Sequence, residues 1–85
     1  MTAASRRVTL YRKAGCGPCD EAADLLGALA APLAFSVDHV DIDSDTQLAR
    51  RYRWAIPVVA VGENEVARAP IRAAKLEDAL RAALV

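Results

Sequence analysis

Short apolar runs alternate with longer amphipathic segments along the chain, and this alternation predicts a βαβαββα order of elements. Runs rich in β-branched and aromatic residues predict strands at residues 8–11, 35–42 and 56–61. A turn at residues 62–64 leads into a short edge strand at 65–68, paired with the third strand as a hairpin. Segments 18–31, 44–52 and 72–84 show helical spacing instead.

Apolar residues at three- and four-residue intervals define the buried faces of the three predicted helices. They are Ala22, Leu25, Leu26 and Leu29 in the first helix, Leu48 and Tyr52 in the second, and Leu76, Leu80 and Leu84 in the third. Pro18 suits the first turn of the first helix, and Pro32 is expected to end that helix. Ser44, with Gln47 three residues later, predicts a capping box at the start of the second helix.

The predicted strands form one four-stranded mixed sheet in an α/β fold with helices on both faces. A helix joins the first two strands, so these run parallel with a right-handed crossover, whereas the last two are antiparallel. Val37 and Val40 lie three positions apart and face opposite sides of a flat strand. Either that strand carries a bulge or helices cover both faces. Pro57 can occupy only the first position of the third strand, because it has no N–H for the ladder.

The length of 85 residues is enough for one domain, spanning 1–85, with residues 1–7 as a flexible start. Eleven basic and 11 acidic residues balance, so the chain lacks the basic excess of a nucleic-acid-binding protein. Arg50, Arg51 and Arg53 form the one dense basic cluster. We interpret it as an exposed helix end, and the alternative is a patch that attracts an anionic thiol substrate.

The hydropathy pattern contains neither a membrane-spanning stretch of about 20 apolar residues nor the apolar core of a secretory signal. We therefore expect a cytoplasmic protein that acts as a monomer and has neither a membrane nor a nucleic acid as partner. In that reducing compartment, a lone pair of cysteines is more often catalytic or metal-binding than structural.

The two cysteines form the motif Cys16-Gly17-Pro18-Cys19 between the first strand and the first helix. Cys16 falls at the helix N-terminus, where free N–H groups and the helix dipole stabilise a thiolate. Lys13 and Arg12 add positive charge nearby, whereas Asp20 and Glu21 oppose it. Cys19 follows one turn deeper, within disulfide reach and shielded from substrate. This asymmetry predicts that Cys16 attacks a substrate disulfide and that Cys19 then resolves the mixed disulfide.

A CxxC motif also occurs as half of a metal site. A structural zinc site needs four ligands, and the chain offers two cysteines and one distant histidine, His39. We therefore expect no metal site within one chain, and we expect His39 on a strand surface rather than as a catalytic base. Two alternatives stay open: a metal or iron–sulfur site shared between two chains, and a catalytically silent interaction domain.

The motif segment at residues 10–22, with Val-Asp-Ile-Asp at 40–43 and Ile-Pro-Val at 56–58, resembles the glutaredoxin-like family of small bacterial thioredoxin-fold proteins. The resemblance implies a thioredoxin fold and a thiol–disulfide oxidoreductase that serves electron transport and cell redox homeostasis. It implies Cys16 as nucleophile, Cys19 as resolving thiol and Pro57 as a cis proline beside them. The substrate-binding positions that it implies are Lys13, Gly17, Pro18, Ile56 and Pro57.

The sequence also departs from that family pattern. Gly17-Pro18 is the dipeptide of thioredoxins, yet Leu10 stands where thioredoxins carry a buried acid. Residues 67–70 lack the glycine pair and acid that hold the γ-glutamyl end of glutathione, so that site is incomplete. The resemblance therefore implies no cofactor beyond the redox-active disulfide. It implies a protein or small-molecule disulfide as substrate, and a reductase or glutathione as electron donor.

Two residues before Pro57 carry separate expectations. Relatives often have glycine at the position of Arg53, so this residue either adopts a left-handed conformation or lies in a different loop. Trp54 is a large aromatic in a small domain, and we expect it in the core rather than over the active site.

Overall fold

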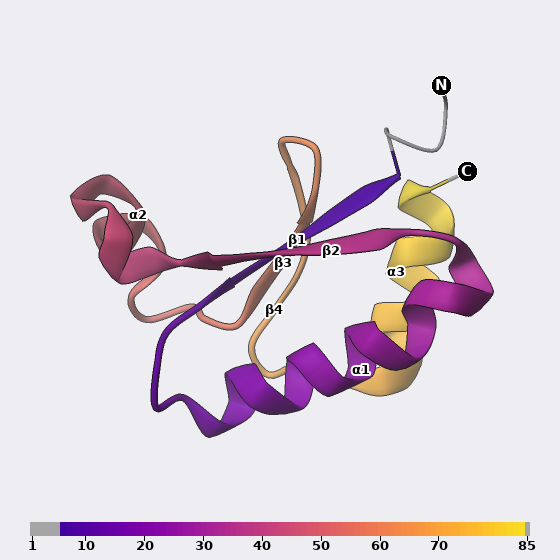
Figure 1. Ribbon diagram of the computed structural model, residues 1–85, viewed down its shortest axis with the longest axis horizontal. Helices are drawn as coiled ribbons and strands as arrows, with labels where there is room; N and C mark the ends of the chain where they lie inside the picture. Colours follow the sequence, from indigo (N-terminus) through magenta and orange to yellow (C-terminus); the bar gives the residue numbers. More distant parts are fainter. Residues whose placement is uncertain (1–5, 85) are drawn as a thin grey trace.

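Eight elements follow one another along residues 6–84, the part of the chain that the computed structural model describes (Figure 1). They are β1 (Arg7–Arg12), α1 (Gly17–Leu33), β2 (Ser36–Asp41), the 3-10 turn η2 (Ile42–Ser44), α2 (Thr46–Tyr52), β3 (Val58–Val61), β4 (Asn64–Arg68) and α3 (Ala73–Ala83). The βαβαββα order is confirmed, with η2 as an addition. None of the helices in this part of the chain is long and apolar enough to cross a bilayer.

The sheet has the strand order β2-β1-β3-β4 and is mixed, as expected. β1 and β2 run parallel in an unbroken register from Arg7 opposite Ser36 to Arg12 opposite Asp41. β2 therefore has no bulge against β1, and Val37 and Val40 face opposite sides of the sheet. β3 lies antiparallel to both β1 and β4, with its one irregularity on the β4 side.

Each face of the sheet carries its own apolar cluster, because successive strand residues point to opposite sides. The larger cluster packs α1 and α3 against the sheet through Val8, Leu10, Ala22, Leu26, Leu33, Phe35, Val59, Leu76 and Leu80. The smaller cluster packs α2 and η2 on the other side through Ile42, Tyr52, Ala55 and Val58. Figure 1 shows α1 and α3 together and α2 apart from them, so helices cover both faces.

The end of α1 differs from the expectation that Pro32 stops it. The helix continues to Leu33 and contains Pro32 in its last turn. One proline this close to the end removes a single backbone hydrogen bond and does not break the preceding turns. The helix ends instead at Ala34, whose left-handed backbone (φ 57°) lets its N–H donate to the carbonyls of Ala30 and Ala31.

The capping box predicted from Ser44 and Gln47 is wrong by one residue. Asp45 caps α2, and its carboxylate accepts the backbone N–H groups of Gln47 at 2.7 Å and Leu48 at 3.3 Å. Ser44 belongs to η2, and its hydroxyl donates to the carbonyl of Asp41 at 2.6 Å. Because residues 42–44 form η2, α2 begins only after them.

β1 begins at Arg7, inside the stretch 1–7 that was expected as a flexible start, and residues 1–5 lie outside the described part of the chain. Arg6 connects the end of α1 to the end of α3 through hydrogen bonds. Its guanidinium donates to the carbonyls of Leu33 and Ala34 at the end of α1, and to that of Leu84 after α3 at 2.8 Å. A cation at these positions satisfies free helix carbonyls and complements both helix dipoles.

Candidate functional site

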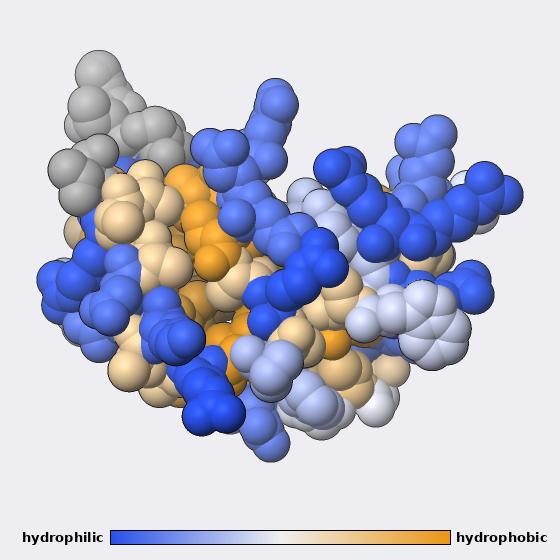
Figure 2. Space-filling model, turned by 180° about the vertical axis from the view of Figure 1, so that it is seen from behind, coloured by the Kyte–Doolittle hydropathy of each residue, from blue (hydrophilic) through white to orange (hydrophobic). Residues whose placement is uncertain are grey.

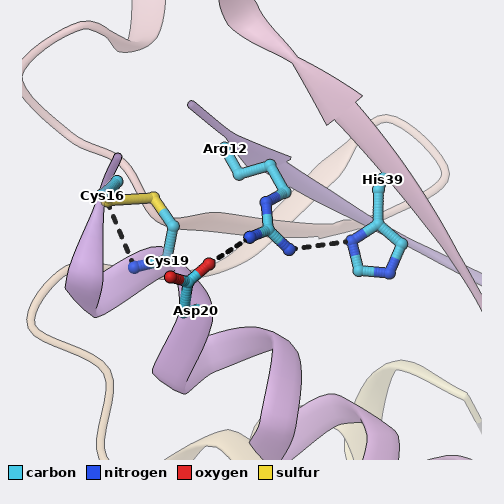
Figure 3. The surroundings of a disulfide bond; sticks show 5 residues. All are labelled: Arg12, Cys16, Cys19, Asp20 and His39. Atoms are coloured by element: carbon cyan, nitrogen blue, oxygen red, sulfur yellow. Dashed lines mark hydrogen bonds and ion pairs between the residues drawn. A yellow bond between two sulfur atoms is a disulfide. The ribbon is translucent and has the colours of Figure 1, made fainter. Parts of the chain in front are cut away.

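The motif lies at the junction of β1 and α1, where the chain turns through Gly15 in a left-handed conformation (φ 76°). Cys16 is the N-cap of α1, with an extended backbone (φ −100°, ψ 105°), and Pro18 stands in the first turn. The sulfur of Cys16 accepts the backbone N–H of Cys19 at 3.2 Å (Figure 3). A cysteine thus fills the position that a serine or aspartate usually occupies at a helix start.

The two cysteines are joined by a disulfide bond, with Cα atoms 5.2 Å apart, and differ in their access to solvent. Cys19 has an exposed fraction of 0%, whereas Cys16 is partly exposed. A substrate from outside can therefore reach the sulfur of Cys16 and not that of Cys19. Gly17 and Pro18 lie exposed beside Cys16, and Gly17 keeps the space next to the motif open.

Arg12 connects the first turn of α1 to β2 beside the disulfide (Figure 3). Its guanidinium pairs with the carboxylate of Asp20 and donates to Nδ1 of His39 at 3.2 Å. Since arginine only donates, Nδ1 of His39 is the acceptor in this contact. Arg12 and Asp20, which the sequence presented as opposing charges, neutralise each other.

His39 itself is exposed on β2, as expected. The connection of His39 to the motif through Arg12 and Asp20 was not predicted from the sequence. A signal for it existed, because Arg12 shares a sheet face with Leu10, and Leu10 packs in the same cluster as α1.

The Ile56–Pro57 peptide bond is cis, which confirms that expectation. Pro57 is buried just before β3, and its carbonyl accepts the N–H of Ala69 at 3.0 Å. The N–H of Ile56 donates to the carbonyl of Tyr52 at 3.1 Å, whereas the Ile56 carbonyl accepts no hydrogen bond within residues 6–84. One backbone acceptor therefore stays free next to Pro57.

Pro57 and Pro18 line one hollow of about 230 Å³. The other lining residues are Glu21, Ala22, Leu25, Ala69, Pro70 and Ile71. The bond between Ala69 and Pro70 is also cis, a feature that was not predicted from the sequence. The structure thus brings the motif and the Pro57 loop together.

Lys13 lies on a different hollow, of about 320 Å³, with Trp54, Arg53, Ile42, Asp43 and Ala49. The expectation that Trp54 packs in the core is wrong, because its exposed fraction is 90%. Tyr52 takes the core position instead: it is 7% exposed and stacks on Tyr11 with ring centroids 4.6 Å apart. Arg53 keeps a right-handed helical backbone (φ −44°, ψ −41°), so the loop differs from the left-handed alternative.

A protein-family model for the glutaredoxin-like domain (DUF836) matches residues 7–81 of this chain. The chain belongs to this glutaredoxin-like family. Its thioredoxin fold and its Cys16–Cys19 pair support a role of the thiol–disulfide oxidoreductase type. A search of curated protein sequences found no significant match.

Solved structures agree with this assignment. Protein XcR50 from X. campestris is 33% identical and has a TM-score of 0.73, with 88% of this chain and 96% of that chain covered. Protein Ne2328 from Nitrosomonas europaea is 27% identical, with a TM-score of 0.72 and coverage of 86% and 88%. Thioredoxin 1 from Thermosipho africanus, 12% identical with a TM-score of 0.67 and coverage of 92% and 93%, shares the fold.

A hollow of about 430 Å³ between Arg6, Arg81 and the ends of α1 and α3 contains no thiol. Within residues 6–84, no three His, Cys, Asp or Glu side chains gather as a set that could hold a metal ion.

Proposed function

We propose that this glutaredoxin-like protein is a dithiol oxidoreductase that reduces disulfides through Cys16 and Cys19. The observation that carries the proposal is the asymmetry of the pair: the sulfur of Cys16 is accessible at the start of α1, and that of Cys19 is buried behind it. A structural staple would gain nothing from one accessible sulfur at a helix N-terminus, whereas stepwise exchange requires it.

The reaction proceeds in two exchanges. The Cys16 thiolate attacks one sulfur of the substrate disulfide, the substrate S–S bond breaks, and the first substrate sulfur leaves and takes up a proton. The Cys19 thiolate then attacks Sγ of Cys16, and the second substrate sulfur leaves as a thiol. Two electrons pass from the protein dithiol to the substrate, and a dithiol or glutathione donor restores the reduced pair.

The local groups favour the first step. The N–H of Cys19 points at the Cys16 sulfur across 3.2 Å, and the dipole of the 17-residue helix α1 adds positive potential there. Arg12 offsets the carboxylate of Asp20 in the first turn of that helix. Together, these groups stabilise the negative charge of the Cys16 thiolate.

The surroundings of Pro57 supply a place for the substrate chain. The free carbonyl of Ile56 can accept a backbone N–H from an extended segment. The hollow lined by Pro18 and Pro57 offers an apolar surface beside the disulfide. We expect the protein to work as a cytoplasmic monomer on protein or small-molecule disulfides.

A turnover assay with two electron donors tests the proposal. A disulfide-bonded peptide is offered together with NADPH and either thioredoxin reductase or glutathione plus glutathione reductase. We expect turnover with at least one donor and none in Cys16→Ser. Absence of turnover with both donors, and also with a chemical dithiol, contradicts the proposal and favours the silent interaction domain. Stoichiometric metal in a dimer of the purified protein favours the shared metal site.

A further inference from the structure

Within residues 6–84, Trp54 is the one large apolar side chain that is exposed. It lies in the loop that leads into Pro57. An exposed fraction of 90% is unusual for an aromatic of this size, because burial of so large an apolar surface favours folding. The guanidinium of Arg53 lies 5.8 Å from the centre of the Trp54 ring, in the range of a cation–π contact. The loop thus presents an aromatic surface and a cation together.

Lys13 brings a second cation to the same place. The hollow of about 320 Å³ contains Lys13, Arg53 and Trp54, with Asp43 as its one acidic residue. Neither Lys13 nor Arg53 takes part in the ion pairs formed within the described residues, which join Arg7–Asp38, Arg12–Asp20, Arg68–Glu65 and Arg81–Glu77. The side chains that line the hollow therefore bring two cations and one carboxylate together.

The position of this hollow relates it to the disulfide. Lys13 precedes Cys16 by three residues, and Trp54 precedes Pro57 by three. The two loops that carry the reactive sulfur and the free Ile56 carbonyl thus also form the walls of the hollow. Figure 2 shows hydrophilic side chains gathered at the end of the molecule where α2 lies, on the right of that view. A segment bound along Ile56 could extend directly onto this surface.

We propose that Lys13, Arg53 and Trp54 select protein substrates that carry an acidic segment beside the reacting cysteine. Carboxylates of the segment pair with the two cations, and its backbone and apolar side-chain atoms lie against the indole. The inference deepens the proposed function and rests on it, because the acidic segment belongs to a disulfide substrate. Charge complementarity identifies the occupant: a basic or neutral segment would leave both cations unpaired.

Binding can be measured without catalysis, because Trp54 is the sole tryptophan of the chain and its fluorescence reports on the hollow. Two matched peptides carry one S-methylated cysteine flanked by three glutamates or by three lysines. The two exposed ion pairs should make the acidic peptide bind about tenfold more tightly, with a change in Trp54 emission. The preference should disappear in Lys13→Gln/Arg53→Gln. Arg50→Gln/Arg51→Gln removes the same number of charges from α2 outside the hollow and should retain it.

Equal affinity for the two peptides, or a preference that survives the double substitution, overturns the inference. Glutathione that displaces the acidic peptide as effectively as the peptide itself also overturns the inference. The same holds if the emission of Trp54 changes with protein concentration alone, because such a change indicates self-association. The same peptides with a disulfide in place of the methyl group separate the two proposals. Selective binding without reduction of either disulfide contradicts the oxidoreductase function, whereas equal reduction of both contradicts the selectivity.

Discussion

The backbone N–H of Cys19 donates a hydrogen bond to Sγ of Cys16 across 3.2 Å, so one half of the redox pair caps the helix that buries the other half. The sequence spacing that brings the sulfurs together also separates their environments. Cys16 has an accessible sulfur and a nearby donor, whereas Cys19 lies inside the first turn of α1. Differences in chemical behaviour between two identical side chains follow from this arrangement.

The reduced protein should therefore react with an alkylating agent at one cysteine first. Iodoacetamide should modify Cys16 at least about a hundredfold faster than Cys19, because alkylation requires an accessible thiolate. Mass spectrometry of digested samples over time measures both rates. In denaturant the two rates should become similar, and comparable rates in the folded protein would contradict the asymmetry.

The pairing of Arg12 with Asp20 should influence the reactivity of Cys16. Arg12→Gln leaves the carboxylate of Asp20 uncompensated in the first turn of α1 and should slow the alkylation of Cys16 by about two- to tenfold. Adding Asp20→Asn removes that charge and should restore the rate. If the double variant stays as slow as Arg12→Gln alone, Arg12 acts through packing rather than through the charge of Asp20.

Asp45 should stabilise the fold as the cap of α2. Asp45→Ala removes the acceptor for the N–H groups of Gln47 and Leu48 and should lower the free energy of unfolding by about 1 kcal/mol. Urea denaturation measures the change. Ser44→Ala is the matched control and should cost less, and the reverse order would favour the capping box that the sequence suggested.

The ion pair between Arg7 and Asp38 should make stability depend on pH in one direction. The hydrogen bond from Arg7 holds the pKa of Asp38 below its ordinary value of 3.8, so folding favours the charged carboxylate. Asp38→Asn should thus be slightly less stable than wild type above that value. The difference should vanish as the pH falls through the lowered pKa, because wild-type Asp38 then becomes neutral as well.

Urea denaturation at a series of pH values measures this difference. Both side chains are exposed, so the effect is small and salt weakens it. A difference that grows toward acid pH would contradict the direction of the shift.

The sequence predicted those features that depend on periodicity and on local chemistry. Alternating strand residues and the leucines of α1 and α3 predicted the sheet and its main cluster, because burial repeats with the period of each element. The place of Cys16 and Cys19 at a strand-to-helix junction predicted the site. Its geometry agrees with the predicted asymmetry, because Cys16 is partly exposed and Cys19 is buried.

Features that depend on competition between neighbours could not be predicted. Helical spacing predicted Tyr52 on the inner face of α2, and it packs there. Trp54 lies beyond the end of α2, where no helical period indicates its exposure. The cap shifted from Ser44 to Asp45 because η2, which has no strong sequence signal, occupies the residues before it. The contact between Arg12 and Asp20 depends on how α1 packs on the sheet, and its one signal in the sequence is the face that Arg12 shares with Leu10.

The measurement that tests the central claim most directly is the trapping of a mixed disulfide. Cys19→Ser and Cys16→Ser are each reduced, mixed with a disulfide-bonded peptide and analysed by intact-mass spectrometry without reductant. The asymmetry predicts that Cys19→Ser accumulates a peptide adduct on Cys16, because the resolving thiol is missing, and that Cys16→Ser accumulates none. An adduct that forms on Cys19 instead, or equally in both variants, would contradict the roles assigned to the two cysteines.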